Sequence, residues 1–312
     1  MRREIELKLT PVEAFDPQRW KQIAASVTGI PAGRIYHIRP LKRSIDARHK
    51  VFFRLKVELF IGEHFPLSAK IAIPAYADVS RRPPVIIVGA GPAGLFAALT
   101  LIKQGFRPVI LERGKDVKAR KFDISTITRG ERVNPDSNYC FGEGGAGTYS
   151  DGKLYTRSTK RGDVSDILRT LVAHGAPEDI LIDAHPHIGT DKLPGIIASI
   201  RRYILESGGE VCFNRKVAGL IVNKGKIKGV TTADGNEFRA ASVILATGHS
   251  ARDVFEFLHN QGILIEPKPF AMGVRIEHPQ QLIDSIQYHI PDRGPYLPAA
   301  TYNLVTQAEG RG

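Results

Sequence analysis

The sequence is poor in residues that build covalent or metal-bound scaffolds. Among 312 residues there are two cysteines, Cys140 and Cys212, and no C-x-x-C pair. A disulfide framework is therefore excluded, and no metal site is expected. No apolar run approaches the roughly 18 residues that a transmembrane helix needs. The N-terminus, MRREIELKLT, lacks the apolar core of a signal peptide, so we expect a cytoplasmic protein with no membrane partner.

Acidic residues are also scarce relative to basic ones. The chain has 44 Lys and Arg against 32 Asp and Glu, a net charge of +12. Residues 1–82 hold 16 basic and 8 acidic residues, so +8 of this charge lies there. This charge indicates either a solvated basic face or a surface for an acidic partner such as nucleic acid.

The first 80 residues predict a small α/β module. Glu4–Leu9 alternates charged and apolar residues, which is typical of a strand. Asp16 before a proline predicts a helix start, with the helix ending near Val27. Two further strands are expected at Ile35–Leu41 and Val51–Ile61, so the order is βαββ.

A linker is expected next, because the stretch 77–84 contains two arginines followed by two prolines. We therefore predict three consecutive domains: 1–80, a dinucleotide-binding domain over 81–258, and the incomplete start of an antiparallel substrate domain over 259–312.

A dinucleotide-binding motif follows the predicted strand Val85–Val88. Gly89, Gly91 and Gly94 form G-x-G-x-x-G at the start of a helix expected over residues 93–104. In such motifs the glycines permit a tight turn, close approach of a pyrophosphate, and helix–strand packing. Glu112 ends the next strand, 18 positions after Gly94, where an acidic side chain can bind a ribose hydroxyl.

This motif alone does not distinguish FAD from NAD. A late buried strand, 243–245, runs into Ala246-Thr247-Gly248, a small-residue turn at the carboxyl edge of the sheet. A β-meander over 211–241 precedes it and interrupts the dinucleotide domain. Both features favour FAD. The expected fold class is α/β, a Rossmann-type domain with an inserted meander.

Several longer motifs resemble known flavoproteins. GAGPAGLFAAL, LERG and ILATG are shared by glutathione-reductase-type flavoproteins with two dinucleotide domains. NPDSNYCFGEGGAGTYSDGKL (134–154), HIGTDKL, ATGHSARD and KPFAMGVRIEHPQQLID (268–284) resemble the bacterial FAD-dependent, NAD(FAD)-utilizing dehydrogenase family. The resemblance runs from about Ser44 to Gly312.

This resemblance implies an FAD-dependent dehydrogenase that transfers hydride between a small-molecule substrate and the flavin, with NAD(P)H as a transient co-substrate. Members of the family continue beyond the equivalent of Gly312, and related flavoproteins hold the ribityl chain with an acidic residue of that later segment. We therefore expect a truncated chain, and whether it retains FAD or activity by itself is left open.

The glycine-rich loop after Cys140 is expected to lie on the cofactor. Glycine at this density lets backbone contact a flat ring, and the alternative is a flexible surface loop. Lys153 either stabilises reduced flavin or is solvated. The expected cofactor-binding residues are Gly89, Gly91, Pro92, Ala93, Gly94, Glu112, Arg113, Gly144, Gly145, Gly147, Ser150, Asp151, Thr247 and Gly248.

Catalytic residues are not identified from the sequence. Cys140 is interpreted as a small buried packing residue rather than a redox thiol, and Cys212 as a core residue. His185 and His187 lack further metal ligands in view. His249 either faces the flavin edge or lies in an ordinary loop.

Two further local features are expected near the C-terminal half. Thr190 or Asp191 is expected to cap the helix LPGIIASIRRYILESGG, which follows Lys192. Arg275 and Glu277 alternate along one strand and face either a substrate cavity or solvent.

Two other functions compete with the dehydrogenase interpretation. A flavoprotein of RNA modification would use the basic N-terminal module, although that module has no aromatic stacking platform. A non-catalytic flavin-binding scaffold is the third class.

Overall fold

The computed structural model describes residues 1–63, 71–75, 77–154, 162–189, 191–269, 273–274 and 276–302. The chain forms two compact units. One comprises Met1–Lys70, Glu178–Pro186 and Phe270–Gly312, and the other Ile71–Pro177 and His187–Pro269. The units interleave along the chain, whereas the sequence predicted consecutive domains.

The first unit contains the expected βαββ order. Its elements are β1 (Arg2–Leu9), α1 (Pro17–Thr28), β2 (Ile35–Asp46) and β3 (Phe52–Ile61), and the antiparallel sheet has the order β1-β3-β2. Asp16 caps α1 by accepting from the amides of Gln18 and Arg19 at 3.0 and 3.4 Å. Gly29 ends the helix with a left-handed φ of 72°.

The core of this unit includes residues from the end of the described chain. Leu7, Trp20 and Leu55 are buried together with Tyr288, the last residue of α7 (Gln280–Tyr288), and Leu297. The strand expected at GVRIEH is not formed over its described residues, 273–274 and 276–278, and α7 follows at Gln280. A strand needs a partner for its backbone hydrogen bonds, and alternation of residue types does not supply one.

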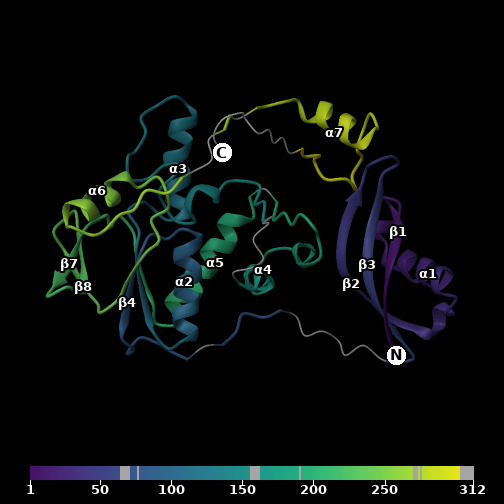
Figure 1. The fold of residues 1–312 in the computed structure, drawn as a ribbon, viewed down its shortest axis with the longest axis horizontal. Coiled ribbons are helices and arrows are strands. Elements are labelled where there is room, and N and C mark those ends of the chain that lie inside the picture. Colours follow the sequence, from purple (N-terminus) through teal and green to yellow (C-terminus); the bar gives the residue numbers. More distant parts are fainter. Residues whose placement is uncertain are drawn as a thin grey trace. The chain divides into compact units, whose positions relative to one another are not determined.

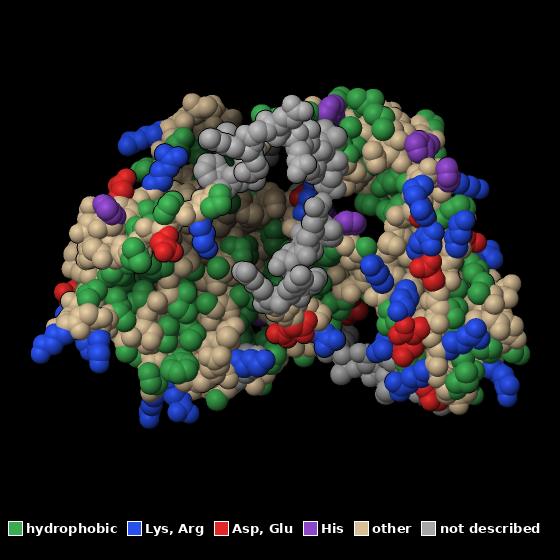
Figure 2. Space-filling model, viewed as in Figure 1, with side chains coloured by type: hydrophobic (Ala, Val, Ile, Leu, Met, Phe, Trp, Pro, Cys, Tyr) green, Lys and Arg blue, Asp and Glu red, His purple; other side chains and the backbone are tan. Residues whose placement is uncertain are grey.

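Most basic residues on the solvent side of β1 and β3 are paired locally. Lys56 lies 2.6 Å from Glu4, and Arg54 lies 2.9 Å from Glu6 on the neighbouring strand. Figure 2 shows basic and acidic side chains mixed over this sheet rather than a continuous basic surface. Nucleic-acid binding by this module remains a prediction that these contacts do not favour.

The second unit is the Rossmann-type domain. Its parallel sheet has the order β10-β4-β5-β6. The strands are β4 (Pro84–Val88), β5 (Arg107–Leu111), β6 (Glu210–Cys212) and β10 (Val243–Leu245), and the helices are α2 (Pro92–Lys103), α3 (Val117–Thr128), α4 (Val164–Ala173), α5 (Leu193–Glu206) and α6 (Arg252–Asn260). Within the described residues, no helix has the length and apolarity needed to cross a membrane.

An antiparallel meander covers one face of the parallel sheet. It consists of β7 (Val217–Asn223), β8 (Lys226–Thr232) and β9 (Glu237–Arg239). Ile86, Val88 and Val109 pack against Val217 and Val230 of the meander. Helices α2 and α5 lie on the opposite face (Figure 1). The meander was expected from Val211, but residues 210–212 pair in parallel with β5, because this short strand completes the sheet at its edge.

The stretch 77–84 is not an open linker. Val79 is buried, and its amide donates to the carbonyl of Ser207 at the end of α5. Asp78 accepts from the amide and hydroxyl of Ser80. Pro84 already belongs to β4. These residues therefore pack on the dinucleotide domain, which begins before the arginine–proline sequence.

Candidate functional site

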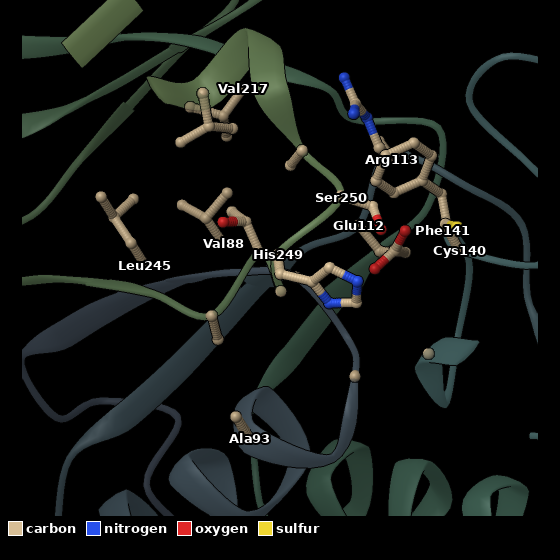
Figure 3. Close-up of a pocket in the computed structure, with 18 of the residues that line it drawn as sticks. Val88, Ala93, Glu112, Arg113, Cys140, Phe141, Val217, Leu245, His249 and Ser250 are labelled. Atoms are coloured by element: carbon tan, nitrogen blue, oxygen red, sulfur yellow. The ribbon is translucent and has the colours of Figure 1, made fainter. Parts of the chain in front are cut away.

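A cavity of about 600 Å³ opens at the carboxyl edge of the parallel sheet (Figure 3). Ligands of open α/β sheets bind at this edge, where the chain turns from strands into loops and helices. The cavity is formed by the ends of β4, β5 and β10 and by the first turn of α2. Of the expected cofactor-binding residues, it is lined by Gly89, Gly91, Pro92, Ala93, Glu112, Arg113, Gly145, Thr247 and Gly248.

Glycine occupies the three motif positions for different physical reasons. Gly89 has φ of 108°, and a Cβ there would lie 2.5 Å from the carbonyl oxygen of Ala246. A Cβ on Gly94 would lie 2.0 Å from the carbonyl oxygen of Gly89. Gly91 has an ordinary φ of −73°, and its nearest neighbour would be the Cα of Gly145 at 3.9 Å. Protein packing thus requires Gly89 and Gly94, whereas Gly91 leaves room for a ligand.

The N-terminus of α2 supplies a positive electrostatic end to this opening. Gly91 is the N-cap and Pro92 the first helical residue, and Leu95 is the first to donate back to Gly91, at 3.0 Å. The amides of Ala93 and Gly94 lie in the first turn of α2, where the helix provides no carbonyl to accept their hydrogen bonds. Exposed amides and the helix dipole favour an anion such as a pyrophosphate.

Glu112 ties three loops together beside the cavity. Its buried carboxylate accepts hydrogen bonds from the amides of Ala90 at 2.7 Å, Gly114 at 2.8 Å and Gly142 at 3.0 Å. A carboxylate has about four acceptor positions, so one position is left for a ribose hydroxyl. The sequence predicted the ribose contact but not the bonds that join both glycine segments.

Arg120 organises the glycine-rich loop and was not predicted. Its fully buried guanidinium donates to the carbonyls of Asn138 at 3.0 Å, Tyr139 at 3.1 Å, and Glu143 and Gly145 at 2.8 Å. Burial lowers the pKa of Arg120 from its ordinary value, although the acidic groups around it act in the opposite direction. An arginine within α3 has no local sequence pattern that would identify this role.

The other side of the loop is anchored by Glu143. This fully buried carboxylate accepts from the amide of Val117 at 2.8 Å and lies 3.3 Å from Arg201 of α5. Burial raises the pKa of Glu143, against the opposing effects of these two partners. The hydroxyl of Tyr149 also donates to Val117, at 2.6 Å. The alternative of a flexible surface loop is therefore wrong.

The loop contributes fewer cavity residues than expected. Gly145 lines the cavity, whereas Gly144, Gly147, Ser150 and Asp151 do not. A Cβ on Gly144 would meet the side chains of Thr148 and Ile197, so its role is packing. Gly94 likewise does not line the cavity, and a Cβ there would meet the carbonyl of Gly89.

One part of the cavity wall is apolar and was not predicted. The side chains of Val217, Val254 and Leu258 line it, and Phe141 adds a flat wall. The guanidinium of Arg113 lies over the ring of Phe141 at 4.4 Å and is held by Asp253. The apolar face of α6 could have indicated this wall from the sequence, but no helix was predicted there.

Individual residues near the site differ from expectation. Cys140 is exposed and lines the cavity; the fully buried side chain of this segment is Arg120, which donates to the carbonyls of Asn138 and Tyr139. Cys212 is partly buried against the sheet core. His249 lines the cavity, and its ring points into it, towards Glu112, in Figure 3.

The expected cap of α5 is not formed. The N-cap is Lys192, without a side-chain bond, and Asp191 has a left-handed φ of 63°. Thr190 and Arg275 lie outside the described residues, and Glu277 is exposed.

Fold and cavity together define a Rossmann-type dinucleotide-binding domain. Three family profiles match the chain. Residues 82–127 match "FAD binding domain", and residues 269–312 match "FAD-dependent protein, C-terminal domain-like". Residues 1–60 match a domain of unknown function, DUF8436. FAD is therefore the cofactor, as the sequence predicted.

Two curated proteins are similar to this chain in sequence. An uncharacterized protein of Clostridium beijerinckii is 39% identical over 285 residues, covering 86% of this chain and 53% of that protein. Thiamine thiazole synthase of Aeropyrum pernix is 30% identical over 185 residues, covering 54% of this chain and 56% of the enzyme. The chain spans about half the length of the curated relatives it matches.

Solved structures show similarity at lower identity. Thermovibrio ammonificans THI4 has a TM-score of 0.38 and 18% identity, with 59% of this chain and 65% of that chain covered. Glycine oxidase from Bacillus cereus has a TM-score of 0.35 and 14% identity, with 57% and 58% covered. The narrower relation to NAD(FAD)-utilizing dehydrogenases of the glutathione-reductase type stays a prediction.

Proposed function

We propose that this chain is the cofactor-binding part of an FAD-dependent oxidoreductase that passes hydride between a small-molecule substrate and the flavin, with NAD(P)H as a transient second substrate. Bound FAD supplies a two-electron donor or acceptor, and the protein binds and orients it. Support comes from the FAD-binding match over residues 82–127 and from the cavity at the sheet edge.

The observation that carries the proposal is the opening at Gly91. Neither φ nor packing requires glycine there, and it stands at the N-terminus of α2 beside the buried carboxylate of Glu112. We assign the ribose of the adenosine to Glu112, the adenine to the apolar end near Phe141, and the pyrophosphate to the first turn of α2. The isoalloxazine then extends beyond Gly145.

Reconstitution tests the proposal. The purified chain is incubated with FAD, FMN or NAD, desalted, and its visible absorbance is recorded. We expect retention of FAD alone, followed by loss of the flavin band on anaerobic titration with NADH or NADPH. A colourless protein would contradict the cofactor site. Retained FAD that neither nucleotide, nor any of a panel of alcohols, amines and 2-hydroxy acids, reduces would instead indicate a non-catalytic scaffold.

A further inference from the structure

Among the described residues that line the cofactor cavity, three have basic side chains: Arg113, Arg215 and His249. FAD brings a pyrophosphate, with its negative charge, into this space. N–H groups that donate to phosphate oxygens form strong, charge-assisted hydrogen bonds. Whether a basic side chain can bind the pyrophosphate therefore depends on the partners that it already has.

The two arginines are already paired with carboxylates. Arg113 donates from both of its terminal nitrogens to Asp253, and its Nε lies 3.3 Å from Asp136 Oδ1. Arg215 donates from Nη1 to Asp234 Oδ2 at 3.1 Å. A neighbouring carboxylate compensates the charge of each guanidinium and so weakens its attraction for a phosphate.

His249 has no such partner. Its ring makes no hydrogen bond or ion pair within the part of the chain that the structure describes. The side chain is exposed, lines the cavity and points into it (Figure 3). Gly248, with a left-handed φ of 71°, turns the chain directly before it. An imidazole carries an N–H donor in its neutral and in its charged form, so this ring can bind a phosphate oxygen.

The sheet places His249 and Glu112 on opposite sides of the end of β4. β4 lies between β10 and β5, and His249 follows β10 whereas Glu112 follows β5. The loop after β10 lies directly against the glycine turn, since a Cβ on Gly89 would lie 2.5 Å from the carbonyl oxygen of Ala246. In Figure 3 the ring of His249 points towards Glu112. A dinucleotide that crosses the end of β4 therefore passes between these two side chains.

Building on the proposed function, we propose that His249 donates a hydrogen bond to the pyrophosphate of FAD. The amides in the first turn of α2 bind the phosphates from the helix side, and the imidazole binds them from the side of β10. The carboxylate of Glu112 repels a phosphate, and an imidazole donor offsets part of this repulsion. His249 is then a cofactor-binding residue at the pyrophosphate, rather than a residue at the flavin edge.

Binding of adenine nucleotides tests this contact without any substrate. Calorimetry on the FAD-free chain measures the Kd for adenosine, ADP and FAD. His249→Leu removes the donor and should raise the Kd for ADP and for FAD about 10-fold or more, because a hydrogen bond to a charged group is lost. The Kd for adenosine, which has no phosphate, should stay within about twofold of wild type. His249→Gln keeps an N–H donor and should recover most of the lost affinity.

The spectra of bound FAD separate a pyrophosphate contact from a flavin contact. In His249→Leu saturated with FAD, we expect the phosphorus NMR resonances of the cofactor to shift from their wild-type positions. The visible absorbance of the flavin should stay unchanged. An altered visible spectrum with unshifted phosphorus resonances would place the ring at the isoalloxazine and overturn the proposal.

The control is His259→Leu, at an exposed position of α6 that does not line the cavity, and it should leave all three Kd values unchanged. Unchanged affinity for ADP and FAD in His249→Leu would refute the proposal. An equal loss for adenosine and ADP would also refute it, because the ring would then act at the adenosine or through the structure of its loop. A wild-type chain that binds neither ADP nor FAD would instead contradict the cofactor site itself.

Discussion

Replacing Gly91 by alanine separates cofactor binding from folding. The new methyl group meets no protein atom closer than the Cα of Gly145, at 3.9 Å, and φ of −73° suits any residue. Alanine restricts the unfolded chain more than glycine does, and this stabilises the folded protein by about 0.4–1 kcal/mol. Alanine is a poorer N-cap than glycine by up to about 1 kcal/mol. The free energy of unfolding of the FAD-free protein should therefore change by less than about 1 kcal/mol.

FAD binding should respond much more strongly. The methyl group occupies the approach of the pyrophosphate to the first turn of α2, and displacement of this group lengthens its hydrogen bonds to the backbone amides. Loss of one charge-assisted hydrogen bond costs about 1.5–3 kcal/mol. The Kd for FAD should rise about 10- to 100-fold.

The matched control is Gly94→Ala in the same motif. Its Cβ would lie 2.0 Å from the carbonyl oxygen of Gly89, so this substitution should destabilise the FAD-free protein by about 3 kcal/mol or more. Urea unfolding measures stability, and quenching of flavin fluorescence measures affinity. If Gly91→Ala binds FAD as tightly as wild type, the cofactor does not pass this residue.

Three further predictions concern the glycine loop and the helix layer. Arg120→Met should cost about 3 kcal/mol or more in urea unfolding, because buried carbonyls lose their donor. An unchanged midpoint of urea unfolding would contradict this prediction and show that water replaces the guanidinium as the donor to these carbonyls. Gly145→Leu, at φ of 70° and 3.2 Å from the Pro92 ring, should alter the visible spectrum of bound flavin and slow its reduction but leave far-UV circular dichroism unchanged. An unaltered spectrum and rate would place the loop away from the cofactor. Burial lowers the pKa of His174, so the folded state favours the neutral ring. Its stabilisation is present above the ordinary histidine pKa of about 6.5 and is lost as the pH falls through the folded value. His174→Gln should weaken the dependence of the melting temperature on pH between pH 5 and 8. A dependence equal to that of wild type would contradict the assignment of this effect to His174.

Local sequence predicted the strand–turn–helix–strand unit around the glycine motif well, because one segment carries the whole signal. The motif from Gly89 to Gly94 and the acidic end of β5 lie within a single strand–turn–helix–strand unit, and the structure places them together at the cavity. The cap of α1 by Asp16 is equally local. Prediction from the sequence was less accurate for elements whose hydrogen-bonding partners lie far away along the chain. The GVRIEH stretch alternates like a strand, yet its described residues form no strand.

Arg120 shows that alternation and spacing of residue types do not reveal hydrogen-bond partners that are distant in the chain. Arg120 bonds to carbonyls 18 to 25 positions further along the chain, and no pattern in α3 announces these acceptors. Cys140 was expected to be a small buried packing residue rather than a redox thiol, but it is exposed, and the buried side chain under this segment is Arg120.

The sequence by itself determined the βαββ module and the Rossmann-type strand–helix order, and its resemblance to known flavoproteins indicated FAD. The module and the strand–helix order follow from apolar periodicity and glycine spacing, which act over a few residues. Tertiary structure alone decided which glycines pack and which one opens to the ligand, and it joined the glycine loop to Glu112 and Arg120. The physical reason is that hydrogen-bond partners and excluded volume depend on segments far apart in the chain, which meet only when the sheet and its helices have assembled.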